Sequence, residues 1–304
     1  MTTSAITLKQ ISNQASAYWE LTKPGINLMV MVSMMIGFFM GSSLMLSFDW
    51  LLFLQVSIGT FLISAGTAAH NQYLERDLDK LMTRTEKRPL PSKKISRLNS
   101  FIFSMSLIFG GFIYLLLNVN FVAAAVSAAT TIIYLGAYTP LKRVSFANVF
   151  VGAIPGALPP VGGWAAATGS ISHEAVWLLF GIAFFWQVAH VVAIAWLCKD
   201  DYGNAGFKML PKDEYASPYN KIVLIVSLAV LIPIGLSFTL LGISTWIFGV
   251  LATLIGGYYL WRGIEFINKL DKDSARKLLF GSLFYLPIVW LALFLDRLIG
   301  GWML

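Results

Sequence analysis

Residues 50–79 decide the fold, because a membrane-length apolar run leads directly into a cluster of charges: WLLFLQVSIGTFLISAGTAAHNQYLERDLD. Its first part, 50–72, carries no charged side chain and has the length, about 20 residues, that crosses a bilayer as a helix. The nine predicted spans are 24–46, 50–72, 100–118, 121–140, 147–169, 174–197, 220–242, 245–264 and 277–295. Charged residues are only 12% of the 304, against about 25% in soluble domains. The sequence therefore predicts an all-α integral membrane protein with nine transmembrane helices.

The basic residues are placed as in a cytoplasmic membrane protein. Of the 22 lysines and arginines, 21 fall in the first 23 residues or in every second loop, and only Arg297 lies elsewhere. The positive-inside rule places the N-terminus in the cytoplasm and the C-terminus across the membrane. We expect a cytoplasmic arm at 1–23 and a single transmembrane domain at 24–304. The arm lacks arginine and a cleaved-signal pattern, which favours a bacterial cytoplasmic (inner) membrane.

The same composition excludes several classes of protein. The net charge of +7 is explained by the cytoplasmic loops, so no nucleic-acid partner is expected. The single cysteine, Cys198, excludes a disulfide framework and a paired-cysteine zinc site. The lipid bilayer is the expected environment for the whole domain.

A weak internal repeat divides the chain. Leu90-Pro91 and Leu210-Pro211 each follow an acidic helix end, and they are offset by 120 residues, or four spans. Spans one to four and five to eight are predicted to be related four-helix halves, with the ninth helix appended. Glycines and prolines crowd 152–163 in the fifth span, which predicts a bent wall beside a bulky substrate or, alternatively, the broken helix of a transporter.

The strongest functional pattern follows the second span. If that helix continues through the charges, Asn71, Glu75 and Asp79 are spaced at i, i+4 and i+8 and form one stripe, while Asp77 points away. Oxygen ligands without thiols or paired histidines suit Mg²⁺. A solvated helix end is the simpler alternative, but three such side chains at the end of a lipid-buried helix are costly unless they are used.

A second acidic group follows the sixth span. Trp196, Lys199, Asp200 and Gly203 share one face if that helix continues, and Asp201 lies beside Asp200. Basic residues flank both acidic groups: Arg84, Arg88, Lys142 and Arg143. Carboxylate-bound Mg²⁺ surrounded by cations can bind a diphosphate and ease its departure. With an apolar bundle below, the pattern predicts an enzyme that acts on a lipid diphosphate.

The extended motifs carry a family resemblance. Asn71-x3-Glu75-x3-Asp79 with a second acidic motif is similar to the membrane-embedded UbiA prenyltransferases. The longer strings resemble the haem O synthase (protohaem IX farnesyltransferase) family within that superfamily. These strings are Glu20-Leu-Thr-Lys-Pro24, Met82-x-Arg84-Thr85-x2-Arg88-Pro-Leu-Pro91, Tyr138-Thr-Pro-Leu-Lys-Arg143, Asn148-x3-Gly152-x3-Gly156-Ala-x-Pro159-Pro160-x2-Gly163-Trp164 and Asp200-Asp201-Tyr202-x2-Ala205-Gly206-x2-Met209-Leu-Pro211. The chain departs from the family at Ala189-His190-Val191, where Pro-His-Phe is usual, and at His70, where a small or apolar residue is expected.

The resemblance implies transfer of a farnesyl group from farnesyl diphosphate to a vinyl group of haem B, giving haem O and diphosphate. Haem B is then a substrate, and Mg²⁺ is the cofactor. The implied metal ligands are Asn71, Glu75, Asp79, Asp200 and Asp201; the implied diphosphate contacts are Arg84, Arg88, Lys142, Arg143 and Lys199. Tyr138 would offer its ring face to the developing allylic cation. Water then adds to the cation that the vinyl attack leaves.

The candidate haem contacts are His190, Trp186 and His70. A lone histidine near the end of a span is as well explained by a hydrogen bond within the bundle. Two other functions remain open: a UbiA-type transferase for an aromatic quinone precursor, and a transporter of a lipid or haem. A haem A synthase or an assembly factor of a terminal oxidase would be the partner that takes haem O onward.

Overall fold

The computed structural model describes residues 13–42, 48–209 and 217–300, and the regular elements within these ranges are all helices. Nine helical segments within them are long and apolar enough to cross a membrane, which confirms the predicted spans. In chain order the elements are α2 (Pro24–Gly41), α3 (Trp50–Asp79), α4 (Arg97–Asn118), α5 (Phe121–Ile132), η1 (Ile133–Tyr138), α6 (Thr139–Leu141), α7 (Asn148–Thr168), α8 (Glu174–Leu197), α9 (Lys199–Asn204), α10 (Pro218–Leu240), α11 (Trp246–Lys269) and α12 (Lys272–Gly300).

Two predictions fall partly outside the described residues. The first span was expected to reach 46, but positions 43–47 are not described. Leu210-Pro211, the second half of the proposed repeat, also lies outside them. The relation between the two four-helix halves therefore stays a prediction.

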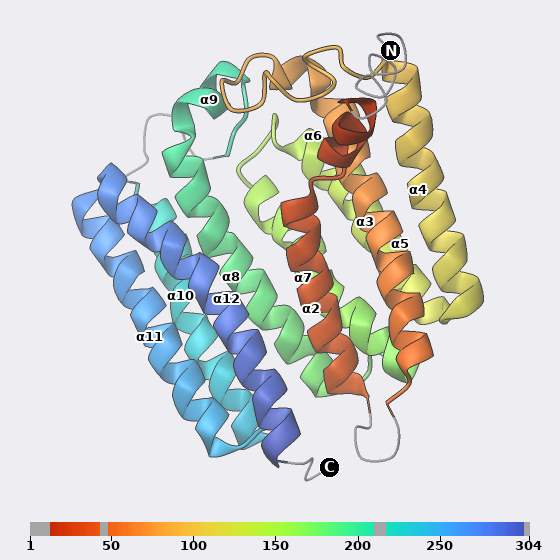
Figure 1. Cartoon of the computed structure of the whole chain (residues 1–304). Helices are drawn as coiled ribbons and strands as arrows, with labels where there is room; N and C mark the ends of the chain where they lie inside the picture. The colour runs from red at the N-terminus through yellow and green to blue at the C-terminus, as the bar shows by residue number, and fades with distance from the viewer. Residues whose placement is uncertain (1–12, 43–47, 210–216, 301–304) are drawn as a thin grey trace, which may run out of the picture.

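Local sequence signals set several helix starts. The side chains of Asp49, Ser96, Asn120 and Ser217 each accept a hydrogen bond from a backbone N–H in the first turn of α3, α4, α5 and α10. Such caps satisfy donors that have no partner within the helix. The caps of α3 and α5 lie at one end of the bundle and those of α4 and α10 at the other (Figure 1), as expected for antiparallel spans.

The helices pack as neighbouring pairs: α3 with α4, α2 with α7, α7 with α8, and α10 with α8 and α11. The closest approach is between α2 and α7. A Cβ atom added to Gly37 would collide with the Pro160 carbonyl, and one added to Gly163 would collide with the Met34 carbonyl. Small residues that let two backbones touch are the usual packing device in membranes, where burial of apolar surface gives little drive.

The fifth span is a single helix. α7 runs from Asn148 to Thr168 with Pro155, Pro159 and Pro160 inside it, and 12 of its 21 residues are buried. The interrupted helix considered for a transporter is therefore absent from this segment.

A wider turn interrupts the fourth span. Residues 133–138 form the π-helix η1 between α5 and α6, where hydrogen bonds skip one residue more than in an α-helix. Such turns occur often at functional sites. Here it sets the direction of the side chains that follow, up to Lys142.

The short elements gather at one end of the bundle. α6, α9 and the loop from 80 to 96 lie together at the upper end in Figure 1, which is also the end where α3 terminates. These are the segments that hold both acidic motifs and most of the basic residues around them. The fold therefore brings both motifs to the same end of the membrane domain.

Candidate active site

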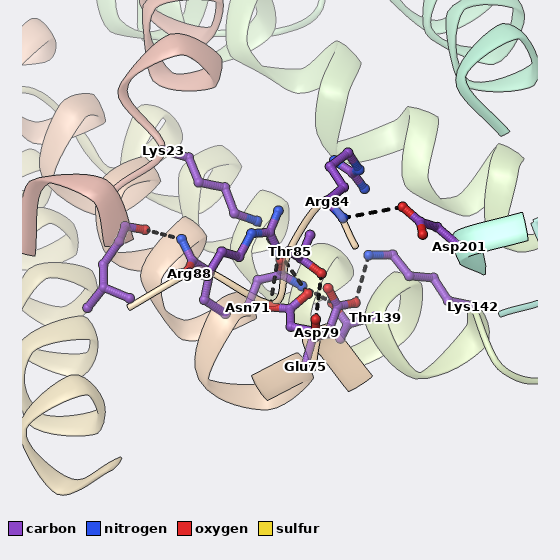
Figure 2. A network of polar contacts seen from close by, with 12 residues as sticks. Lys23, Asn71, Glu75, Asp79, Arg84, Thr85, Arg88, Thr139, Lys142 and Asp201 are labelled. Carbon is purple, nitrogen blue, oxygen red and sulfur yellow. Dashed lines mark hydrogen bonds and ion pairs between the residues drawn. The ribbon is translucent and has the colours of Figure 1, made fainter. Parts of the chain in front are cut away.

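The helix α3 continues through the first acidic motif to Asp79, as predicted. Asn71, Glu75 and Asp79 are buried, with exposed fractions of 1%, 5% and 0%. Figure 2 shows the three side chains gathered at one site. Asp77 instead lies outside the cluster, more than half exposed, and pairs with Lys80, Arg76 and Arg97. The predicted stripe of Asn71, Glu75 and Asp79 is confirmed, and so is the prediction that Asp77 points away from it.

Each member of the stripe is bound by one cation, and each cation comes from a different segment. Lys23 Nζ, just before α2, donates to Asn71 Oδ1 at 2.7 Å. Lys142 Nζ, after α6, donates to Glu75 Oε1 at 2.7 Å. Arg88 Nη1, in the loop after α3, donates to both Asp79 oxygens at 2.8 and 3.0 Å. Three segments thus bring three basic side chains to one cluster with two carboxylates and an amide (Figure 2).

The pKa values of Lys23 and Lys142 are shifted in opposite directions. Burial and the nearby Arg88 guanidinium lower the pKa of Lys23 to about 7, although Glu75 acts against them. Burial would also lower the pKa of Lys142, but the Tyr138 oxygen and the Glu75 carboxylate outweigh it and the pKa is raised. Lys142 therefore stays charged at neutral pH. Lys23 also has a left-handed backbone, with φ of 50°, a conformation that non-glycine residues adopt at a cost.

The π-helix orients the far side of the cluster. Thr139 Oγ1 donates to the Tyr134 carbonyl at 2.8 Å and accepts from Asn71 Nδ2 at 3.2 Å. With Lys23 on its oxygen, the Asn71 amide is fixed at both ends. Tyr138 lies beneath Lys142, whose Nζ is 4.5 Å from the ring centroid. The ring of Tyr138 sits against Gly152 of α7, where an added Cβ would come within 2.5 Å of it.

A clamp of backbone and side-chain bonds holds Lys142 in place. The Lys208 N–H donates to the Lys142 carbonyl at 2.6 Å. Asn148, fully buried at the start of α7, donates from Nδ2 to the Ser145 carbonyl at 2.6 Å and to the Lys208 carbonyl at 2.8 Å. Phe207 adds its ring, 5.6 Å from Lys142 Nζ. The segment after α9 therefore fixes the lysine that binds Glu75.

The second acidic motif is arranged differently. α8 ends at Leu197, and Cys198 leaves the helical conformation before α9 begins at Lys199. The expected single face from Trp196 to Gly203 is therefore wrong, although Lys199 Nζ still lies 4.9 Å from the Trp196 ring centroid. Asp200 is exposed.

Asp201 contacts the loop after α3 rather than a side chain of the stripe. Its two oxygens accept from the backbone N–H groups of Thr83 and Arg84 at 3.2 and 3.4 Å. The Arg84 guanidinium lies 5.9 Å from the Tyr202 ring centroid. Arg143 is exposed on the turn after α6. The second motif thus joins the loop that carries Arg84 and Arg88 to the end of α8.

The oxygens of the two motifs are not assembled into one ligand set. Across the described ranges, no three His, Cys, Asp or Glu side chains form a group that could hold a metal ion. The donor chemistry nevertheless fits Mg²⁺, because the stripe presents an amide oxygen and two carboxylates, and each of these three groups already attracts a cation. Magnesium binding would therefore exchange one positive partner for another.

The three candidate haem contacts fall on two different faces. His70 Nδ1 is 2.9 Å from Ser104 Oγ on α4, and its ring packs near Tyr73 and Phe101. His190 Nδ1 is 2.7 Å from Ser282 Oγ on α12, and its ring stacks on Trp186 with centroids 4.9 Å apart. Trp186 Nε1 donates to the Ser282 carbonyl at 2.7 Å. His190 and Trp186 therefore form one unit between α8 and α12, whereas His70 lies between α3 and α4.

Sequence reasoning missed three residues of the site: Lys23, Thr139 and Asn148. Each stands inside a motif that carries the resemblance, but none is acidic or close in sequence to the acidic residues. A lysine directly before the first span was the available signal for Lys23. The contacts of Thr139 and Asn148 depend on the π-helix and on the segment after α9, for which the sequence offers no comparable pattern.

Comparison with known protein sequences shows the family to which the chain belongs. A sequence model described as the UbiA prenyltransferase family matches residues 30–288. A protein of Solibacter usitatus named protoheme IX farnesyltransferase is 42% identical over 288 residues, covering 92% of this chain and 98% of that protein. The matched range contains both acidic motifs.

Solved structures have the same fold. A digeranylgeranylglyceryl phosphate synthase superposes with a TM-score of 0.78 at 17% identity, over 93% of this chain and 98% of that one. A UbiA homolog from Archaeoglobus fulgidus, bound to GPP and Mg²⁺, superposes with a TM-score of 0.66 at 16% identity, over 91% and 99%. At these identities the likeness shows the fold alone.

Proposed function

Because this chain belongs to the UbiA prenyltransferase family, we propose that it transfers the farnesyl group of farnesyl diphosphate to a vinyl group of haem B, giving haem O and diphosphate. The observation that carries the proposal is the buried stripe of Asn71, Glu75 and Asp79, contacted by three basic side chains at one end of an apolar bundle. Such a site suits an anionic leaving group whose hydrocarbon tail extends between the helices. The farnesyl and haem specificity rests on the identity to relatives of that name.

Mg²⁺ is the proposed cofactor, and its ligands would be Asn71, Glu75, Asp79 and Asp200. Asp201, also expected from the sequence to be a ligand, would instead hold the loop after α3, because its two oxygens accept from Thr83 and Arg84 N–H. When bound, the metal neutralises the diphosphate and makes it a better leaving group. The stripe supplies oxygens that are buried and already oriented by Thr139 and by the cations. Asp200 and Asp201 belong to the loop side of the site, which faces solvent.

The cations would have a second use in the substrate complex. Lys142 and Arg88 would bind phosphate oxygens in place of the carboxylates that they contact now. This exchange avoids leaving an unpaired charge in a buried site, which would be strongly destabilising. Lys23 joins them from the other side of the stripe, and Arg84, Arg143 and Lys199 extend the positive rim.

The reacting carbon would lie beside Tyr138. The ring is held between Lys142 and the Gly152 surface of α7, directly below the diphosphate cluster. Its face can stabilise the allylic cation that forms as the C–O bond breaks. The surrounding apolar helices exclude water from this cation until the acceptor is in place.

The haem would be seated by His190 and Trp186 rather than by His70. The Nδ1 of His190 is held by Ser282, which leaves Nε2 as the ring nitrogen for haem iron or a propionate. His70 is bonded to Ser104 and contacts rings of α3 and α4, away from α7 and α8.

The nine apolar helices make this a multi-pass membrane protein. We assign it to a bacterial cytoplasmic membrane, with the N-terminus and both acidic motifs in the cytoplasm and the C-terminus outside. The domain would extend over 24–304, with the described part of the arm packed on α3 through Leu21 and Gln72. A haem A synthase or oxidase assembly factor would receive the product.

The deciding experiment combines purified protein in detergent with farnesyl diphosphate, haem B and Mg²⁺, followed by mass spectrometry of the extracted haem. A haem heavier by one farnesyl and one water is expected, and it should disappear when Mg²⁺ is chelated. Glu75→Gln serves as the inactive control. If the protein prenylates an aromatic acid and leaves haem B unchanged, the chain is instead a transferase for a quinone precursor.

A further inference from the structure

The side chain of Gln187 is a polar group at membrane depth whose amide has no hydrogen bond within the described part of the chain. Gln187 lies in the middle of α8 and is half-buried. An amide moved from water into an apolar setting without a partner costs about 1–3 kcal/mol. Polar side chains inside membrane helices are therefore usually bonded to another helix, to water or to a substrate.

Gln187 lies against a glycine of α7. A Cβ added to Gly156 would come 3.1 Å from Gln187 Cδ and 3.2 Å from its Oε1. One helical turn earlier, Gly152 makes the same room for the ring of Tyr138. Two glycines on one face of α7 therefore seat two functional side chains in succession, separated by about 6 Å along the helix axis.

The order of these contacts gives the depth of Gln187. α7 begins at Asn148, beside the Lys142 loop, so Gly156 lies deeper in the bundle than Gly152. Lys142 binds Glu75 above, Tyr138 lies beneath Lys142, and Gln187 comes next along α7. On α8, Gln187 precedes His190 by three residues and follows Trp186 directly. Gln187 thus lies deeper in the bundle than Tyr138 and next to the proposed haem contacts Trp186 and His190 on α8.

We infer that Gln187 holds the water molecule that adds to the haem vinyl carbon after farnesyl transfer; this inference rests on the proposed function. In the transfer, the vinyl π electrons form a bond to C1 of the farnesyl group. The C1–O bond breaks, and its electron pair leaves with the diphosphate. The vinyl carbon next to the porphyrin ring becomes a cation. A lone pair of the bound water forms the C–O bond there, and the released proton passes to the diphosphate.

The amide suits this role because it both accepts and donates hydrogen bonds. Gln187 can bind a water proton through Oε1 and leave the water lone pair free for the cation. Without a held water, the same cation loses a proton from the neighbouring carbon and becomes a conjugated alkene. The two outcomes differ in mass by one water, so the product itself reports whether the water was in place.

The test is the product ratio of Gln187→Leu, which keeps the size of the side chain and removes its polar atoms. Purified variant and wild type are given farnesyl diphosphate, haem B and Mg²⁺, and both farnesylated haems are quantified by mass. We expect the ratio of hydrated to dehydrated product to fall about tenfold, the scale of one lost hydrogen bond. The control is Gln55→Leu. Gln55 is also half-buried but lies near the start of α3, at the end of the bundle away from the acidic motifs, so this variant should leave the ratio unchanged.

An unchanged ratio in Gln187→Leu would overturn the inference, and a raised KM for haem beside that unchanged ratio would make the amide a haem contact. If Gln187→Leu aggregates, Gln187→Met replaces it, because it also removes the amide, and an unchanged ratio in that variant has the same meaning. Absence of both farnesylated haems in the wild type would contradict the proposed function instead.

Discussion

The two acidic motifs look alike in the sequence but differ in the structure. In the first, Glu75 and Asp79 are buried and bound to Lys142 and Arg88. In the second, Asp200 is exposed and Asp201 accepts from backbone N–H groups of the loop after α3. Burial decides the difference, because a charge in a low-dielectric site must be balanced whereas an exposed one is screened by water. The first motif is therefore built for binding charge, and the second for holding the loop that carries part of the site.

The largest effect is expected from Asp79→Asn. It leaves the Arg88 guanidinium beside a buried neutral amide and removes the negative charge of a proposed metal ligand, so we expect activity to fall at least about a thousandfold. Asp77→Asn is the matched control, because it makes the same change two residues away on the exposed side of α3. Initial rates of haem farnesylation on monodisperse protein measure both. Equal losses in the two variants would contradict the distinction between the buried stripe and the exposed side.

The first motif was also the part of the site that the sequence predicted best. Its spacing on a continuing helix was enough to place Asn71, Glu75 and Asp79 on one face and Asp77 on another. The second motif was predicted poorly, because the break at Cys198 is a matter of backbone angles and not of composition. Hydropathy located the nine spans because membrane helices obey length and polarity rules that are local in sequence, as the spacing of the stripe is.

Contacts made across the fold could not be predicted in this way. Lys23 reaches Asn71 across 48 positions, and Asn148 reaches Lys208 across 60. Neither pair has a periodicity that joins its members, and the π-helix that orients Thr139 replaces an ordinary turn within an unbroken apolar run. The sequence therefore predicted the acidic half of the cluster and two of its cations, Arg88 and Lys142, while the third cation, Lys23, depended on which segments meet at the end of the bundle.

The second prediction concerns the clamp on Lys142. Asn148→Asp would place a carboxylate against the carbonyl oxygens of Ser145 and Lys208, which now accept from the amide. We expect a loss of about 2 kcal/mol, or about thirtyfold in kcat/KM, carried mainly by KM for farnesyl diphosphate. Asn118→Asp changes an exposed amide that donates to a single carbonyl at the other end of the bundle. A fall in kcat alone, with KM unchanged, would show that the clamp does not act through the diphosphate.

The third prediction separates the two residues of the second motif. Asp200→Asn should raise the Mg²⁺ concentration needed for half-maximal rate about tenfold, because it removes the negative charge of a proposed ligand. Asp201→Ala should leave this concentration unchanged and raise KM for farnesyl diphosphate about tenfold, because it frees the loop at Thr83 and Arg84. Magnesium titrations of both variants make the comparison. The reverse pattern would assign the metal to Asp201. It would also show that the contact of Asp201 with the loop does not affect the binding of farnesyl diphosphate.

The smallest effect is expected at the histidines, where two similar contacts lie on different faces of the bundle. His190 and His70 each bond to a serine of a neighbouring helix, at 2.7 and 2.9 Å. Such bonds contribute about 0.6 kcal/mol on average in membranes, so stability in detergent should change little and equally in His190→Ala and His70→Ala. If His190 also contacts haem, only His190→Ala should raise KM for haem, by about threefold or more, with KM for farnesyl diphosphate unchanged. Equal haem KM values in the two variants would remove His190 from the haem site and leave it as a hydrogen bond between α8 and α12.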